Sequence, residues 1–161
     1  MFEEQLLNPD YHDRRNFTSG ISELDEYIQR FAAQQSKKNI AVVRVLVDST
    51  TPHVILGYYS LSAAQIDVMQ LDDKARKKLP RYPIPCFRMG RLAVHSAHQG
   101  RGLGRLLIGC VIERCLEAKK QVAAYALVVD AKGNQAKKFC EHYGFIACYE
   151  NPMTLYLLLG G

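Results

Sequence analysis

A short segment, residues 99–120 (QGRGLGRLLIGCVIERCLEAKK), constrains the fold more than any other part of this 161-residue chain. Glycine occupies three of its first six positions, and Leu103, Leu107 and Val111 then recur at helical spacing. Residues 87–95 (FRMGRLAVH), just before it, have the character of a strand. A strand, a glycine turn and a helix therefore follow one another directly, which is typical of α/β proteins.

The rest of the chain predicts a mixed sheet with further helices. Ser22 and Asp25 resemble a capping box at the start of an amphipathic helix over residues 22–34. Asn134 is an expected N-cap for a second helix, and Gly144 is expected just after its end. The remaining strands are predicted at residues 40–47 and 54–63, which form a hairpin, and at 122–130, 145–149 and 153–159. Without a repeat or a linker, residues 1–161 are expected to form one domain.

Composition excludes several classes of protein. Hydrophobic residues make up 48% of the chain, and 21 Lys and Arg against 16 Asp and Glu give a formal net charge of +5, which favours an anionic ligand. No apolar run approaches the roughly 20 residues that span a bilayer, and acids stand where a signal peptide needs cations. The five cysteines form no C-x-x-C pair. We therefore expect reduced core thiols, no metal, no membrane and a cytoplasmic location.

The glycine turn is suited to an anion. Glycine allows close approach of the backbone, a helix N-terminus carries about half a positive charge, and Arg101 and Arg105 add charged donors, so the natural guest is a phosphate or pyrophosphate. A tight turn that needs glycine only sterically is the alternative. A P-loop is excluded because no Lys-Ser or Lys-Thr follows the glycines, and a dinucleotide fingerprint is disfavoured because Arg105 and Leu107 stand where glycine is required.

The pattern Q-x-x-G-x-G, formed by Gln99, Gly102 and Gly104, resembles the acyl-CoA pyrophosphate loop of the GNAT superfamily of N-acetyltransferases. The resemblance covers nearly all of the chain, from the early hairpin through LAV at residues 92–94 to VVD and NQAKKFCEHYGF near the end. It implies an α/β GNAT fold, in which a mixed central β-sheet is flanked by helices and a splayed strand pair holds acetyl-CoA.

The same resemblance implies roles for individual residues. A backbone N–H near Val94 would act as an oxyanion hole for the thioester, and Tyr143 would protonate the departing CoA thiolate. The residues implied to bind acetyl-CoA are Leu92, Ala93, Val94, Gln99, Gly100, Arg101, Gly102, Leu103, Gly104, Arg105, Asn134, Lys137 and Phe139.

A narrower resemblance lies in FTSGISELDEYI, GYYSLSA, YPIPCFRMGRLAV and LYLLL, which are similar to the acetyltransferase toxins of type II toxin–antitoxin pairs. Those toxins acetylate the α-amino group of aminoacyl-tRNA and block translation, and a ribbon-helix-helix antitoxin neutralises them and represses the operon. A homodimer would join two basic faces into one tRNA platform. The residues expected to contact tRNA are Lys74, Arg76, Lys77, Lys78, Arg81, Arg88 and Arg91, with an ordinary solvated charged face as the alternative.

The strand that should line the reaction centre, PCFRMGRLAVH, contains no carboxylate. An α-amine with a pKa of about 7.7 to 8.0 is substantially neutral without a base, whereas a lysine amine of about 10.4 is not. The absence of a carboxylate from this strand therefore favours the α-amine of an aminoacyl group as the acceptor. The alternative is that Glu23 or Asp25, from another part of the chain, serves as the general base. Two other functions remain open: acetylation of a small amine, polyamine or peptide N-terminus, and a non-catalytic acyl-CoA- or RNA-binding module. The glycine loop and Tyr143 together argue against the second.

Overall fold

The computed structural model describes residues 1–160, and its elements fall into two compact units. The first unit comprises Met1–Ser62 and Gly90–Val111, and the second comprises Ala63–Met89 and the chain from Ile112 onward. In the described part of the chain, the strands are hydrogen-bonded in the order β1 (Phe2–Leu6), β2 (Val42–Asp48), β3 (Gly57–Ile66), β4 (Ile84–Val94), β5 (Ala126–Asp130), β7 (Thr154–Leu158) and β6 (Ile146–Ala147). β4 and β5 run parallel, whereas β1 with β2, β2 with β3, β5 with β7 and β6 with β7 are antiparallel. The prediction of a mixed α/β sheet is confirmed; the single domain and the splayed strand pair stay predictions.

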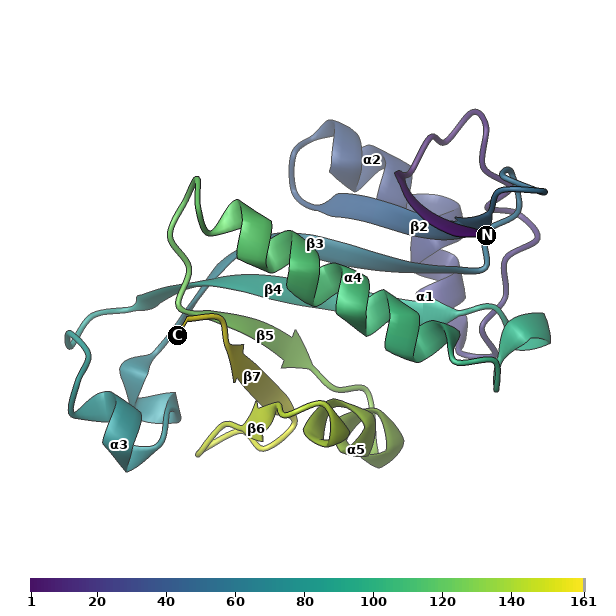
Figure 1. Ribbon diagram of the computed structural model, residues 1–161. Helices are drawn as coiled ribbons and strands as arrows, with labels where there is room; N and C mark the ends of the chain where they lie inside the picture. Colours follow the sequence, from purple (N-terminus) through teal and green to yellow (C-terminus); the bar gives the residue numbers. More distant parts are fainter. Residues whose placement is uncertain (161) are drawn as a thin grey trace. The chain divides into compact units, whose positions relative to one another are not determined.

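The first unit contains the early hairpin, a long helical segment and the glycine turn (Figure 1). Ser22–Lys37 is helical throughout, with a π-helical stretch in its middle. β3, β4 and α4 each continue into the second unit. The elements are β1 (Phe2–Leu6), α1 (Ser22–Glu26), η1 (Tyr27–Phe31), α2 (Ala32–Lys37), β2 (Val42–Asp48), β3 (Gly57–Ile66), β4 (Ile84–Val94), η3 (Ser96–His98) and α4 (Leu103–Ala118).

Successive side chains of β2 point to opposite faces of the sheet, and helices pack on both faces. Val43, Val45 and Val47 point to one face, where they form a core with residues of α1, η1 and α2 such as Ile28. This is the period of two that a half-buried strand requires. On the other face, Leu107 of α4 lies against Gly57 of β3. The hairpin therefore holds the start of α4, and with it the glycine turn, at a fixed place.

The second unit carries its own core, which includes Leu71 just after η2 (Val68–Gln70), Cys86 of β4, Val128 of β5 and Tyr156 of β7. Cys86, Cys115, Cys140 and Cys148 are free and buried, and Cys110 is half-buried. None of the helices in residues 1–160 is long and apolar enough to cross a membrane. The elements are η2 (Val68–Gln70), α3 (Asp73–Arg76), β5 (Ala126–Asp130), α5 (Asn134–His142), β6 (Ile146–Ala147) and β7 (Thr154–Leu158).

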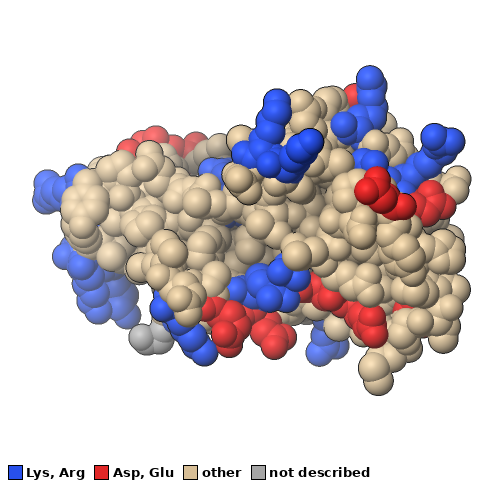
Figure 2. Space-filling model, turned by 90° about the horizontal axis from the view of Figure 1, so that it is seen from above, with Lys and Arg blue, Asp and Glu red and all other residues tan. Residues whose placement is uncertain are grey.

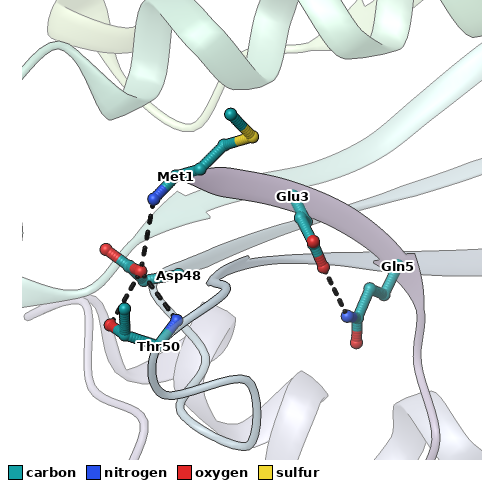
Figure 3. A network of polar contacts seen from close by, with 5 residues as sticks. All are labelled: Met1, Glu3, Gln5, Asp48 and Thr50. Atoms are coloured by element: carbon teal, nitrogen blue, oxygen red, sulfur yellow. Dashed lines mark hydrogen bonds and ion pairs between the residues drawn. The ribbon is translucent and has the colours of Figure 1, made fainter.

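Strand β1 was not predicted from the sequence. It pairs with β2, and its anchoring at the chain start is polar (Figure 3). The ammonium group of Met1 lies 3.5 Å from Oδ1 of Asp48, which also accepts hydrogen bonds from the backbone N–H of Thr50 at 3.0 Å and from its hydroxyl at 2.9 Å. These hydrogen bonds from Thr50, the backbone one foremost, lower the pKa of Asp48 below its usual value.

Two predicted helix caps are wrong. Ile21, not Ser22, occupies the N-cap position of α1, and no side chain caps it. Asp25 instead accepts hydrogen bonds from Ser19, whose backbone N–H and hydroxyl both lie 2.7 Å from Oδ1. At α5 the N-cap is Gly133, with a φ of 131° that suits glycine, and Asn134 is the first residue of the helix.

Candidate active site

The glycine turn has the geometry of an anion-binding loop. Gly100 and Gly102 have φ values of +83° and +77°, and a Cβ added at either would meet nothing within 4 Å. Glycine is therefore required by backbone conformation, and the space above both residues is open. α4 begins at Leu103, as predicted, and the N–H groups of a helix's first turn have no acceptor within the helix. The loop therefore fits a phosphate group.

Gln99 acts as a brace within the first unit. Its side-chain amide donates to the carbonyl oxygen of Ser19 at 2.9 Å and to that of Val94 at 3.2 Å. These two bonds tie the start of the loop to the end of β4 and to the segment before α1. The Gln99 amide is thus occupied by the protein backbone, and its role is to position the loop.

A chain of hydrogen bonds continues from that brace to α1. Asp25 accepts from the backbone and hydroxyl of Ser19, and Thr18 donates its hydroxyl to the other carboxylate oxygen at 3.1 Å. Ser96 in turn donates from its backbone to the carbonyl of Thr18 at 2.7 Å. Both oxygens of Asp25 are engaged in this structural network, whereas Glu23, the other alternative base, is exposed.

Leu92, Ala93 and Val94 are the last three residues of β4. Ala93 is buried in the core under α1 and α2, while Leu92 and Val94 are half-buried. The strand end is packed closely, because a Cβ at Gly57 would lie 2.9 Å from the carbonyl oxygen of Ala93 and 2.7 Å from a methyl carbon of Leu107.

The cationic residues of the turn differ in their contacts. Nη1 of Arg101 lies 2.8 Å from Nδ1 of His98, and its guanidinium lies over the ring of Phe2, 5.9 Å from the centroid. Arg105 is exposed in the first turn of α4. Leu103 is buried, so only its backbone can serve a ligand. Gly104 is half-buried beside it.

In the second unit, Tyr143 stands at the end of α5. Gly144 follows it with a φ of +93°, and the N–H groups of Gly144 and Phe145 donate to Glu141 at 3.0 Å and Cys140 at 3.2 Å, respectively. This is the Schellman arrangement, and it confirms the predicted position of Gly144. The ring of Tyr143 packs edge-on against Phe139, with centroids 5.0 Å apart. The tyrosine is half-buried and held by its neighbours.

The other α5 residues predicted to bind acetyl-CoA lie on the same helix as Tyr143 but differ in exposure. Asn134 is exposed at its first position, and Lys137 and Phe139 are half-buried. The structure therefore places the predicted residues in two groups: residues 92–105 of the first unit, and α5 with Tyr143 in the second.

The seven predicted tRNA contacts differ in availability. Arg88 forms an ion pair with Asp130, which also accepts a hydrogen bond from Thr154 at 2.7 Å. Arg91 is half-buried, with its guanidinium 3.8 Å from the centroid of the Tyr27 ring. Lys and Arg side chains stand at several places on the face seen in Figure 2, its left-hand end among them. The exposed members of the set are Lys74, Lys77, Lys78 and Arg81.

Known proteins resemble this chain over nearly its whole length. A tRNA-acetylating toxin of Mycobacterium tuberculosis is 30% identical over 150 residues, which are 93% of this chain and 88% of the relative. The crystal structure of a tyrosine-to-phenylalanine variant of KacT superposes with a TM-score of 0.93 at 28% identity, covering 98% of this chain and 95% of the other. AtaT in complex with acetyl-methionyl-tRNAfMet gives a TM-score of 0.91 at 25% identity, with the same coverage of 98% and 95%.

Another similar solved structure contains acetyl-CoA. AtaTR bound with acetyl-CoA gives a TM-score of 0.85 at 26% identity, covering 98% of this chain and 94% of the other. The acetyltransferase (GNAT) domain family itself matches residues 30–147, a range that includes the glycine turn and Tyr143. With the mixed sheet, the open glycine loop and the capped tyrosine helix in place, the chain belongs to the GNAT family of acetyltransferases.

Proposed function

We propose that this protein is the toxin of a type II toxin–antitoxin pair, and that it transfers the acetyl group of acetyl-CoA to the α-amino group of aminoacyl-tRNA, which blocks translation. The observation that carries the proposal is 30% identity, over 93% of this chain, to a tRNA-acetylating toxin. The solved complex of AtaT with acetyl-methionyl-tRNAfMet supports the same acceptor.

Acetyl-CoA binding is assigned first to the glycine turn, where the space around the backbone is open. Gly100 and Gly102 would place N–H groups close to the pyrophosphate, while Arg101 and Arg105 would add charge. Gln99 would act through the loop it braces. The remaining residues assigned to this co-substrate are Leu92, Ala93, Val94, Leu103, Gly104, Asn134, Lys137 and Phe139.

The chemistry requires little from the protein beyond positioning and one proton. Acetyl-CoA supplies a thioester carbonyl. The neutral α-amine forms the new N–C bond as the C–S bond breaks, the hydroxyl of Tyr143 gives its proton to the leaving sulfur, and the proton lost by the amine passes to solvent, from which the tyrosine is reprotonated. A backbone N–H near Val94 would stabilise the oxyanion. No protein base is needed, because an α-amine is substantially neutral near pH 8.

The proposal also assigns partners and a place of action. Exposed Lys74, Lys77, Lys78 and Arg81 would contact tRNA phosphates. A ribbon-helix-helix antitoxin would neutralise the toxin and repress the operon with it, and a homodimer would join two basic faces. We place the protein in the cytoplasm, where aminoacyl-tRNA is found, and treat residues 1–161 as one GNAT domain.

The experiment measures CoA thiol release from acetyl-CoA in the presence of a pool of charged tRNAs, the same pool after deacylation, or a polyamine. Release is expected with charged tRNA only. Tyr143→Phe should reduce turnover by about 10²- to 10⁴-fold, the usual contribution of a general acid, with acetyl-CoA affinity unchanged. Tyr11→Phe, which removes the hydroxyl of an exposed tyrosine in the first unit, is the matched control and should retain full activity.

Release with the polyamine but not with charged tRNA would assign the protein to small-amine acetylation. Acetyl-CoA binding without release under any condition would indicate a non-catalytic module. Full turnover by Tyr143→Phe would withdraw the catalytic role of Tyr143 and leave the substrate assignment standing.

A further inference from the structure

We propose that Tyr149 is a stacking platform for an unpaired nucleobase of the tRNA, with Arg76 holding the back of its ring. The proposal rests on the proposed function, since it concerns how the same RNA is held. The ring of Tyr149 is 73% exposed, and the guanidinium of Arg76 lies over it at 5.7 Å from the centroid. A large apolar ring left in solvent, with a cation against one face, presents its other face to a flat partner.

Both the cation behind the ring and the backbone of Tyr149 are held by other contacts. Arg76 also forms an ion pair with Asp73 of the same short helix and is only 25% exposed, so the guanidinium has a set position. The backbone N–H of Tyr149 donates to the carbonyl of Gln70 at 3.1 Å. With its backbone held and one face of its ring against the Arg76 guanidinium, Tyr149 has less conformational freedom to lose when a base stacks on it.

The turn that carries Tyr149 is anchored at its next residue as well. Gln70 donates its side-chain amide to the carboxylate of Glu150 at 3.1 Å and accepts from the backbone N–H of Glu150 at 3.2 Å. The backbone of Cys148 donates to Thr154 at 2.8 Å across the turn. The carboxylate of Glu150 is therefore held by a hydrogen bond from Gln70.

The charges around the platform match RNA. α3, which supplies Arg76, also carries Lys74, and Lys77 and Lys78 follow directly, all three exposed. The acids of this neighbourhood are Asp73, paired with Arg76, Asp72, whose side chain caps α3 by accepting from the N–H of Ala75 at 2.8 Å, and Glu150, which accepts from the side-chain amide of Gln70. Lysines that contact phosphates beside an exposed aromatic ring are the combination that single-stranded nucleic acid requires.

Stacking on an aromatic ring is chemically specific for an unpaired base. A base within a duplex has both faces covered by its neighbours, whereas unpaired bases of RNA commonly stack on aromatic side chains. The tRNA part that Tyr149 contacts is therefore single-stranded. This separates Tyr149 from the lysines, which read phosphates irrespective of pairing.

The test uses a property of the whole chain, which contains no tryptophan. Tyr149→Trp keeps a stacking ring at the exposed position and makes it the sole indole of the protein. Its fluorescence is titrated with uncharged tRNA in the absence of acetyl-CoA, and with a blunt-ended RNA duplex, which has no unpaired base. Strong quenching by tRNA and little by the duplex is expected. Tyr11→Trp, at a 49%-exposed tyrosine of the first unit, is the control and should not be quenched.

Two further variants separate the ring from its hydroxyl. Tyr149→Leu should weaken tRNA binding about five-fold or more, as loss of one stacked base does, with the salt dependence of binding unchanged. Tyr149→Phe should bind like the parent. Because the side chain is largely exposed, both variants should keep the parent's circular dichroism spectrum and melting temperature.

Absence of quenching in Tyr149→Trp, or equal quenching in Tyr11→Trp, would overturn the proposal. Parent-like binding by Tyr149→Leu would do the same. An equal loss in Tyr149→Phe would assign the contact to the hydroxyl, and a reduced salt slope would assign it to a phosphate, so either result would also overturn stacking. If the parent acetylates charged tRNA while Tyr149→Leu binds tRNA as the parent does, only this inference fails, whereas a parent that neither binds nor acetylates tRNA refutes the proposed function itself.

Discussion

Removing the Gln99 side chain should loosen the glycine turn and destabilise the fold by a predictable amount. Gln99→Ala deletes two hydrogen bonds from a neutral amide, at 2.9 Å to the carbonyl of Ser19 and at 3.2 Å to that of Val94. A typical intramolecular hydrogen bond contributes about 0.5 to 1.5 kcal/mol net, so the free energy of unfolding should fall by about 1 to 3 kcal/mol.

For a chain of this length, that loss corresponds to a decrease in melting temperature of roughly 2 to 12 °C. Calorimetry gives the melting temperature, and steady-state kinetics should show a raised KM for acetyl-CoA, because both bonds lie at the base of the loop. Gln121→Ala, at an exposed position after α4, is the matched control and should change neither quantity. If Gln99→Ala melts with the parent and keeps its KM, the brace has no energetic role and the reasoning fails.

Three other perturbations test separate parts of the structure. Gly102→Val should abolish the thermal stabilisation that acetyl-CoA gives the parent, because a side chain blocks the loop at a φ of +77°; an unchanged shift in a thermal titration would remove the loop assignment. Gly57→Ala should lower the free energy of unfolding by about 1 to 3 kcal/mol, since its Cβ would lie 2.7 Å from Leu107; equal denaturant midpoints would contradict this close packing. Burial lowers the pKa of His12, whose Nδ1 accepts from the N–H of Asn8 at 2.9 Å. The unfolded chain therefore takes up a proton first, and stability should fall as the pH drops below about 6.5. His12→Gln should remove part of that decrease in pH-dependent unfolding, and an identical profile would exclude His12 as a cause.

The elements that the sequence predicted correctly are those with local signals. The glycine turn, the start of α4 and the end of α5 depend on residues that are a few positions apart. Gly144, for example, has a φ of +93°, and glycine is the residue that most readily adopts this conformation just after a helix. β1 had no such signal, because its FEEQL sequence places acids in a strand at the sheet edge. Its existence depends on pairing with β2, far away in the chain.

The contacts that could not be predicted from the sequence join residues far apart in the chain, or form in place of another local interaction. Gln99 and Ser19 are 80 residues apart, so a brace between them leaves no periodic signal. Ser22 and Asp25 form a pattern typical of a capping box. Asp25 instead accepts hydrogen bonds from both the backbone N–H and the hydroxyl of Ser19, and these replace the capping interaction. The sequence predicts that Arg88 is a free cation in a basic stretch. The parallel pairing of β4 with β5 brings it close to Asp130, with which it forms an ion pair.

The measurement that tests the central claim most directly is the mass of the aminoacyl group after reaction. Charged tRNA is incubated with the enzyme and acetyl-CoA, the ester is hydrolysed under mild base, and the released amino acid is analysed by mass spectrometry and fragmentation. The account predicts an amino acid with one added acetyl group on its α-nitrogen, formed by the parent and lost in Tyr143→Phe. Unmodified amino acid beside consumed acetyl-CoA, or an acetyl group on a side chain, would contradict it.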